Sequence, residues 1–134
     1  MTERPKIILA KVGMDGHDRG IATLSVWLRD AGMEVINLGR YRTVPEVVRA
    51  AIQEDAHVIG LSFLGGEHLH FVPLVLEEMK KNNISIPLVV GGIIPRKHIP
   101  QLKEMGVSGI FPAGSSMEEI IAEVKRLAAS DATD

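Results

Sequence analysis

Short apolar runs alternate with amphipathic stretches along nearly the whole chain of 134 residues. Five of the apolar runs have the length and the β-branched content of buried strands. They occupy Lys6–Lys11, Glu34–Asn37, Val58–Ser62, Leu88–Val90 and Gly109–Phe111. A segment with helical spacing of apolar residues follows each run, as at Ile21, Leu24 and Leu28. Because parallel strands are joined by helical crossovers, this alternation predicts an α/β fold with a five-stranded parallel sheet, covered by helices on both faces.

The starts of two predicted helices are marked by capping boxes. Thr43 with Glu46, and Ser116 with Glu119, have the three-residue spacing of that motif. For a chain of this length the flavodoxin-like, Rossmann-like strand order 2-1-3-4-5 is favoured, with its switch point between strands one and three. We therefore expect a single domain over residues 1–134, with a core at about 6–128 and a loose tail at 129–134.

The composition excludes several classes of protein. There is no cysteine, which removes disulfides, thiolate metal sites and cysteine nucleophiles. The formal net charge of −2 argues against nucleic acid as a ligand, since its phosphates favour basic surfaces. The longest apolar runs are far shorter than the roughly 20 residues of a membrane span, and residues 1–6 show no signal-peptide pattern. The sequence therefore predicts a cytoplasmic protein that binds neither nucleic acid nor a membrane.

The segment from Lys11 to Gly20 falls where the first predicted strand passes into the first helix. Such connections are where α/β sheets bind ligands. In an irregular loop, residues two apart can project to the same side. Asp15 could then accept the N–H of one His17 ring nitrogen while the other ring nitrogen ligates a metal, and Lys11 could reach Asp15 and bias its charge. The alternative is an ordinary turn with solvated side chains.

Small residues recur where other predicted strands end, at Gly65–Gly66, Gly91–Gly92 and Ala113–Ser116. Backbone without Cβ atoms permits the close approach of a ligand. Because the carboxyl ends of parallel strands share one edge of the sheet, these segments favour a groove for a long ligand beside the first loop. The alternative for Ser62 and Leu64 is that they are packed residues at the end of a strand.

Three strings in this chain resemble the ordered motifs of cobalamin-binding domains. Asp15–Gly20 resembles the D-x-H-x-x-G signature. Ser62–Leu64 and Gly91–Gly92 match the S-x-L and G-G elements that follow it in that family. The resemblance runs from about Lys6 to Leu127, which is nearly the whole chain.

The resemblance implies a role for each matching residue. His17 is expected to be the metal ligand, replacing dimethylbenzimidazole as the lower axial ligand of cobalt. Lys11 and Asp15 would support it, and no further catalytic residue is expected in this chain. Ser62 would contact the nucleotide tail of the coenzyme, and Leu64 would form a wall of its slot. The full set expected to bind the coenzyme, the last four at the ribose and phosphate, is Asp15, Gly16, His17, Asp18, Arg19, Gly20, Ser62, Leu64, Gly65, Gly91, Gly92, Gly114 and Ser115.

Within the cobalamin family, the stretch from Ala10 to Gly20 is most similar to acyl-CoA mutases such as the methylmalonyl-CoA and 2-hydroxyisobutyryl-CoA enzymes. Corrinoid methyl carriers usually have a helical cap domain before the binding domain, whereas about five residues precede the first predicted strand here. The resemblance implies the small subunit of an adenosylcobalamin-dependent acyl-CoA mutase, inactive without a large TIM-barrel subunit that binds the acyl-CoA. A corrinoid methyl carrier and a non-catalytic cobalamin carrier or sensor are the alternatives.

The other histidines give weaker signals. Glu67, His68 and His70 have the spacing of metal ligands, but one H-x-H pair beside one acid is weak evidence for zinc. His57 and His98 are expected to be structural or solvated.

Overall fold

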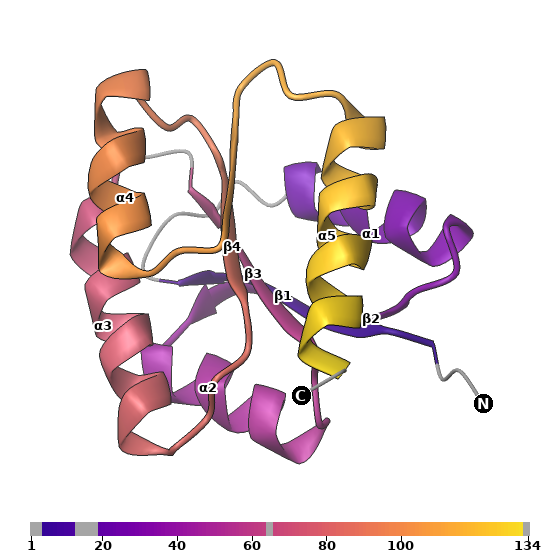
Figure 1. Ribbon diagram of the computed structural model, residues 1–134, viewed down its shortest axis with the longest axis horizontal. Coiled ribbons are helices and arrows are strands. Elements are labelled where there is room, and N and C mark those ends of the chain that lie inside the picture. The colour runs from indigo at the N-terminus through magenta and orange to yellow at the C-terminus, as the bar shows by residue number, and fades with distance from the viewer. Residues whose placement is uncertain (1–3, 13–18, 64–65, 133–134) are drawn as a thin grey trace.

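The computed structural model describes residues 4–12, 19–63 and 66–132, which form a five-stranded parallel sheet between two layers of helices (Figure 1). The strands are β1 (Lys6–Val12), β2 (Glu34–Arg42), β3 (Val58–Phe63), β4 (Leu88–Gly92) and β5 (Gly109–Pro112). The helices are α1 (Arg19–Asp30), α2 (Val44–Gln53), α3 (His68–Lys81), the 3-10 helix η1 (Arg96–His98), α4 (Ile99–Met105) and α5 (Met117–Ala132). The order β2-β1-β3-β4-β5 confirms the predicted fold and its switch point between β1 and β3.

Two elements extend well beyond their predicted ends, whereas the other four strands exceed theirs by one or two residues. β2 continues past Asn37 to Arg42, because its pairing with β1 resumes after an irregularity at which Ala10 pairs with Gly39. There the Gly39 N–H donates to Asn37 Oδ1 at 2.9 Å, and Gly39 has a φ of +79°. A bulge of this kind interrupts the alternation by which strands are recognised. α5 continues to Ala132, so most of the tail expected to be loose from residue 129 is helical.

The helix starts agree with the predicted capping boxes. At α2, the Glu46 N–H donates to Thr43 Oγ1 at 3.2 Å, and the Thr43 N–H donates to Glu46 Oε1 at 2.8 Å. The same reciprocal pair joins Ser116 and Glu119 before α5, at 3.0 and 3.2 Å. None of the helices in the described ranges combines the length and the hydropathy that a transmembrane span requires.

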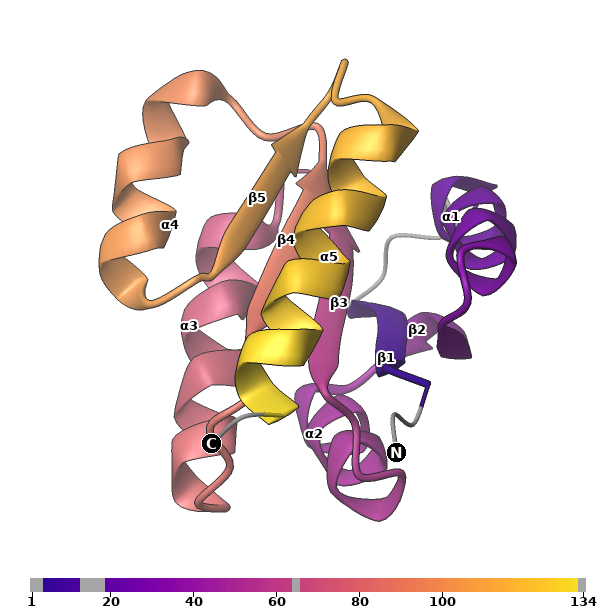
Figure 2. The same cartoon turned by 45° about the vertical axis from the view of Figure 1, so that its right-hand side comes forward.

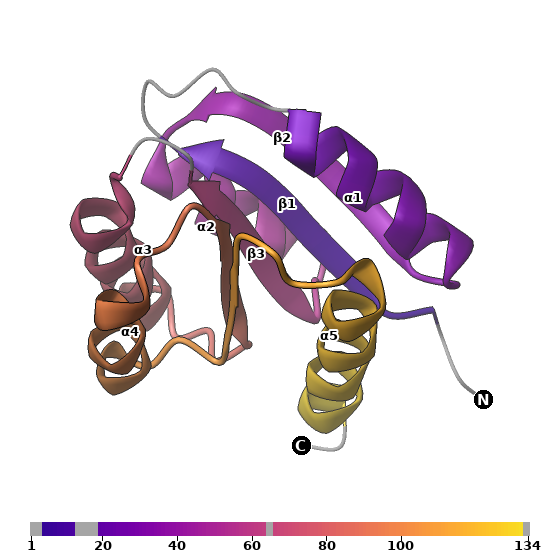
Figure 3. The same cartoon turned by 90° about the horizontal axis from the view of Figure 1, so that it is seen from above.

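Each face of the sheet has its own hydrophobic core. α2, α3 and α4 cover one face, where Ile8, Ile59 and Val90 are fully buried. α1 and α5 cover the other face, over Ile7 and Val58 (Figures 2 and 3). Because side chains alternate along a strand, neighbouring residues of β1, β3 and β4 belong to different cores.

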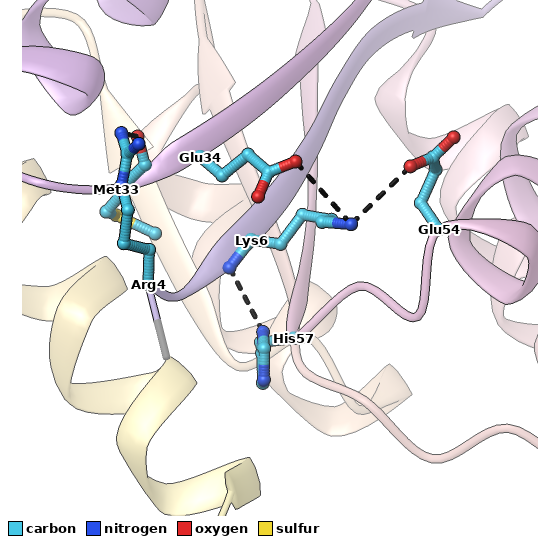
Figure 4. A network of polar contacts seen from close by, with 6 residues as sticks. All are labelled: Arg4, Lys6, Met33, Glu34, Glu54 and His57. Carbon is cyan, nitrogen blue, oxygen red and sulfur yellow. Dashed lines mark hydrogen bonds and ion pairs between the residues drawn. The ribbon is translucent and has the colours of Figure 1, made fainter. Parts of the chain in front are cut away.

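Polar contacts join the chain at the amino ends of β1, β2 and β3 (Figure 4). Lys6 Nζ lies 3.6 Å from Glu34 Oε2 and 3.5 Å from Glu54 Oε1, at the end of α2. The Lys6 backbone N–H donates to His57 Nδ1 at 3.0 Å, which agrees with the structural role expected of His57. These contacts lie at the edge of the sheet opposite to the one where the predicted site residues gather.

Candidate functional site

The carboxyl edge of the sheet brings predicted site residues of several elements together. Ser62 at the end of β3 pairs with Gly91 at the end of β4, and Gly92 is the last residue of β4. Arg19 and Gly20 begin α1. Six predicted site residues lie outside the described ranges, and their roles stay predictions: Asp15, Gly16, His17, Asp18, Leu64 and Gly65.

Lys11 is fully buried near the carboxyl end of β1. Its alternation with Ile7 and Leu9 puts it on the face of the sheet that α1 and α5 cover. Lys11 Nζ donates to the backbone oxygen of Ser62 at 3.1 Å. This bond joins β1 to β3 at the switch point of the sheet. The predicted contact between Lys11 and Asp15 falls outside the described residues.

An apolar cavity of ≈ 180 Å³ lies between the sheet and the helices α1 and α5. For scale, an apolar cavity of about 150 Å³ holds a benzene molecule. Among the residues that line it, Ser62 alone has a polar side chain. Volume and lining therefore suit a flat, largely apolar ring that meets one hydroxyl group. The main contributors from the strands and the two helices are Leu9, Gly60, Val89, Gly91, Ile21, Leu24, Ile120 and Val124.

At two positions that line the cavity, a glycine leaves space that a side chain would fill. A Cβ at Gly60, in the middle of β3, would lie 2.8 Å from Leu9 Cδ2, and one at Gly91 would lie 3.3 Å from the Phe111 backbone oxygen. Gly91 was among the predicted site residues, whereas Gly60 was not, because Gly60 falls inside an apolar run that predicts a buried strand. The available signal was that a glycine inside a strand marks a close approach of neighbouring groups.

Gly92 is required by the backbone itself. Its φ is +114°, and a Cβ there would overlap the carbonyl group of Phe63. That carbonyl oxygen accepts the N–H of Ile93 at 2.8 Å, which holds the chain as it leaves β4. Gly92 also lines the cavity, but a substitution there tests the fold before it tests ligand binding, and its contact with the coenzyme stays a prediction.

Gly114 and Ser115 form the turn between β5 and α5. Gly114 has a φ of +96°, and both the N–H and the Oγ of Ser115 donate to the Pro112 oxygen, at 3.1 and 2.7 Å. Neither residue lines the cavity, whereas Met117 at the start of α5 does. Their predicted contact with ribose and phosphate stays a prediction.

His68 and His98 form a pair that the sequence analysis did not connect. His68 is buried at the start of α3, and its Nε2 lies 2.9 Å from His98 Nδ1. Burial, and secondarily the nearby His98, lower the pKa of His68 from its ordinary value. His70 is exposed and stacks edge-on against Phe71 instead. Within the part of the chain that the structure describes, no three potential metal ligands gather, so the weak zinc pattern at Glu67–His70 finds no support.

The outer side of α1 exposes two large apolar side chains. Val26 is 52% exposed and Trp27 is 48% exposed, while Ile21 and Leu28 on the inner side are buried. Trp27 is not among the residues that line the cavity. The tryptophan therefore belongs to the outer surface of the helix that covers the cavity.

Comparison with known proteins agrees with the motifs. Residues 5–122 match the family model described as the B12 binding domain. The chain is 42% identical over 123 residues to the pivalyl-CoA mutase small subunit of Xanthobacter autotrophicus, which covers 91% of this chain and 82% of that one. It is 37% identical over 126 residues to the 2-hydroxyisobutanoyl-CoA mutase small subunit of Aquincola tertiaricarbonis, which covers 93% of each.

Among solved structures, the fold is similar to that of a cobalamin-binding protein from Desulfitobacterium hafniense. The TM-score is 0.81 at 21% identity, over 93% of this chain and 60% of that one. At that identity the likeness concerns the fold, whereas the family follows from the match over residues 5–122. The chain belongs to the B12-binding domain family.

Proposed function

We propose that this chain is the cobalamin-binding subunit of an adenosylcobalamin-dependent acyl-CoA mutase. The observation that carries the proposal is the apolar cavity lined by Gly60 and Gly91, beside the switch point of the sheet, in a chain of the B12-binding domain family. Two relatives that match over most of their own length are named as small subunits of acyl-CoA mutases. Their names favour a mutase subunit over a methyl carrier or a sensor.

The described residues suit the nucleotide tail of cobalamin. Its benzimidazole ring is flat and largely apolar, and the cavity offers apolar walls with the hydroxyl of Ser62 at one side. Lys11 joins β1 to β3 beside it. His17 is the proposed cobalt ligand, with Asp15 orienting its ring through the other ring nitrogen. When bound, adenosylcobalamin supplies a Co–C bond that breaks homolytically, while the protein supplies binding and orientation.

The acyl-CoA is bound mainly by a large TIM-barrel subunit in this proposal. The described helices cover the two faces of the sheet, and its carboxyl edge carries connections between elements. Radical chemistry requires that water and oxygen are excluded, so the partner has to close over the corrin at this edge. The identity of the acyl group is then decided by the partner. The predicted cytoplasmic location belongs to the same proposal.

The cobalt ligand can be tested by spectroscopy. Protein with nitrogen-15 histidine is loaded with cobalamin, and the electron resonance spectrum of the Co(II) form is recorded. We expect superhyperfine coupling to a histidine nitrogen, which the His17→Ala variant loses. Coupling to the dimethylbenzimidazole nitrogen in the wild-type protein would contradict the proposed ligand.

The activity can be tested by reconstitution. The purified chain is mixed with its cognate large subunit, adenosylcobalamin and candidate acyl-CoA esters, and isomerised product is measured. We expect product from the mixture and none from either chain alone. Turnover by this chain without a partner would refute the subunit assignment. Tight cobalamin binding with no large subunit that binds the chain would favour the carrier or sensor.

A further inference from the structure

We propose that His68 and His98 are positioning residues for the coenzyme, whose mutual hydrogen bond fixes the carboxyl ends of β3 and β4 in their binding arrangement. The inference rests on the proposed function, since it concerns the same site. His68 is the first residue of α3 and is 1% exposed, and His98 is the last residue of η1. The two residues are 30 positions apart in the sequence, and their ring nitrogens lie 2.9 Å apart.

On β3, Phe63 connects the pair to the cavity. Ser62 lines the cavity on one face of the sheet, and Phe63 projects into the core on the other face. The ring of Phe63 lies 6.2 Å from that of His68, centroid to centroid. His68 therefore packs behind the residue that offers the cavity its hydroxyl group.

On β4, the connection to η1 carries His98. This connection is held to β3 where the Ile93 N–H donates to the Phe63 oxygen, one position beyond the pairing of Ser62 with Gly91. The histidine pair is a second tie between the same two connections, further from the sheet. Loss of the pair frees the start of α3 to move relative to η1, and with it the strand ends that carry Ser62 and Gly91.

The tie depends on the protonation of the two rings. One ring nitrogen has to donate and the other has to accept, and two charged imidazoles have no acceptor left and repel each other. No group in the described part of the chain hydrogen-bonds His68 Nδ1, so a proton there gains no partner. Burial, followed by the neighbouring His98, lowers the pKa of His68, in accordance with a neutral ring.

His98 is the hydrogen-bond partner of His68, and the charged groups on the surrounding elements do not take its place. In the described chain, the hydrogen bond of the His68 side chain goes to His98. β3 ends in the uncharged Ser62 and Phe63. The other titratable or charged groups on the elements around the pair are Glu67 before α3, His70, Glu77, Glu78, Lys80 and Lys81 on α3, Glu46 and Arg49 on α2, which packs on α3, Arg96 and Lys97 on η1, and Lys103 and Glu104 on α4.

The direction of the pH dependence follows from the lowered pKa. The folded state favours neutral His68, whereas in the unfolded chain the ring titrates near its ordinary pKa of 6.5. The stability that neutral His68 contributes is therefore complete above that value. It is lost as the pH falls below 6.5 and through the lowered pKa of the folded state. The tie between the two connections weakens over the same acidic range.

Coenzyme binding by two variants at His98 and one control variant tests the inference. The full chain is titrated with adenosylcobalamin at about pH 7.5 and about pH 5.5, on either side of the ordinary histidine pKa. We expect His98→Ala to bind about five- to tenfold more weakly at the higher pH, the usual effect of one lost buried hydrogen bond. His98→Asn keeps a neutral hydrogen-bonding group and should restore the affinity. It should also lose less affinity than wild type on acidification. His70→Ala, at an exposed histidine of the same helix, is the matched control and should bind like wild type.

Acid weakens metal–ligand bonds in every variant alike, so the comparison that counts is wild type against His98→Asn. If His98→Ala does not fold, His98→Asn carries the binding test, and His98→Asp carries the NMR measurement described below. A His98→Ala protein with wild-type affinity at both pH values would overturn the inference. So would a His98→Asn protein with the pH dependence of wild type.

Proton NMR of the protein without coenzyme gives an independent measurement. His68 should titrate below its ordinary range in wild type and above it in His98→Asp, because a carboxylate stabilises the charged ring. The same titration in both proteins would overturn the inference. Failure of wild type to bind adenosylcobalamin would refute the proposed function instead, and wild-type binding with no effect of His98→Ala would refute this inference alone.

Discussion

The two faces of the sheet are built from the same strands, but one face carries a filled core and the other carries the cavity. On the face covered by α2, α3 and α4, β3 contributes Ile59, Leu61 and Phe63, all of which are buried in a continuous core. On the face covered by α1 and α5, the intervening residues Gly60 and Ser62 leave the ≈ 180 Å³ cavity. One run of six residues therefore encodes a filled face and a hollow one.

The difference shows how an α/β domain can hold an apolar ring without losing its stability. Large side chains on the filled face supply the burial of apolar surface that drives folding. The fold therefore tolerates small residues, which bury less apolar surface, on the other face. In β4 the same division separates Val90 from Gly91. Among the strand residues, substitutions of side chains that face the filled side are expected to change stability, and substitutions of those that face the hollow side are expected to change coenzyme affinity.

The largest effect on stability is expected at Gly92, where the backbone itself requires a glycine. Gly92→Ala should lower the free energy of unfolding by more than about 4 kcal/mol, because its Cβ would overlap the Phe63 carbonyl at a left-handed φ. Urea unfolding measures this. Gly32→Ala is the matched control: Gly32 also has a positive φ, of +97°, but nothing lies within 4 Å of its Cβ position. It should cost only about 1–2 kcal/mol. Equal costs for the two variants would show that the overlap is unimportant.

On the filled face, Ile59→Ala should lower the free energy of unfolding by about 3 kcal/mol, since a fully buried side chain leaves a void. Adenosylcobalamin affinity, measured under conditions where the variant is folded, should change little. Ile120→Ala removes the same atoms from a half-buried residue that lines the cavity, and it should cost less stability. If Ile120→Ala destabilised the protein more than Ile59→Ala, the division between the faces would be wrong.

On the hollow face, Gly60→Ala should weaken adenosylcobalamin binding at least about tenfold, or 1.4 kcal/mol. The new methyl group meets the movable end of Leu9 at 2.8 Å, and Leu9 can yield only by moving within the cavity wall. The free energy of unfolding should stay within about 1 kcal/mol of wild type. Equilibrium titration and urea unfolding of the same preparation give both values. Unchanged affinity would mean that the coenzyme tail lies elsewhere.

The smallest effect is expected at the amino edge, at the opposite end of the strands from Ser62 and Gly91. Lys6→Met removes two partly exposed ion pairs, with Glu34 and Glu54, and should cost about 0.5 kcal/mol. The cost should shrink further at high salt, because exposed charges are screened. Coenzyme affinity should be that of wild type. A large loss of affinity would show that this network influences the carboxyl edge.

The fold could be predicted because its signals are local. The alternation of apolar runs with amphipathic stretches located all five strands. The capping boxes at Thr43 and Ser116 located two helix starts. Where the local signal failed, the structure shows why. β2 passes through a bulge at Gly39, and Arg42 beyond it still pairs with Val12 of β1.

The site was less predictable because it depends on contacts between distant segments. Motifs identified Ser62 and Gly91, but Gly60 acts through Leu9 of another strand, and no spacing in the sequence reports that distance. The bond between His68 and His98 likewise joins residues that a pattern search treats separately. The metal ligand predicted at His17 lies outside the described residues and awaits the spectroscopic test.

The exposed tryptophan on α1 gives this protein a built-in optical probe. Trp27 is the single tryptophan of the chain, and it lies on the outer surface of a helix whose inner surface closes the cavity. A corrin bound at the carboxyl edge would quench its fluorescence through energy transfer, with no label and no substitution at the site. Stopped-flow recording of this emission would resolve whether the tail enters as fast as the corrin docks, or waits for α1 to move.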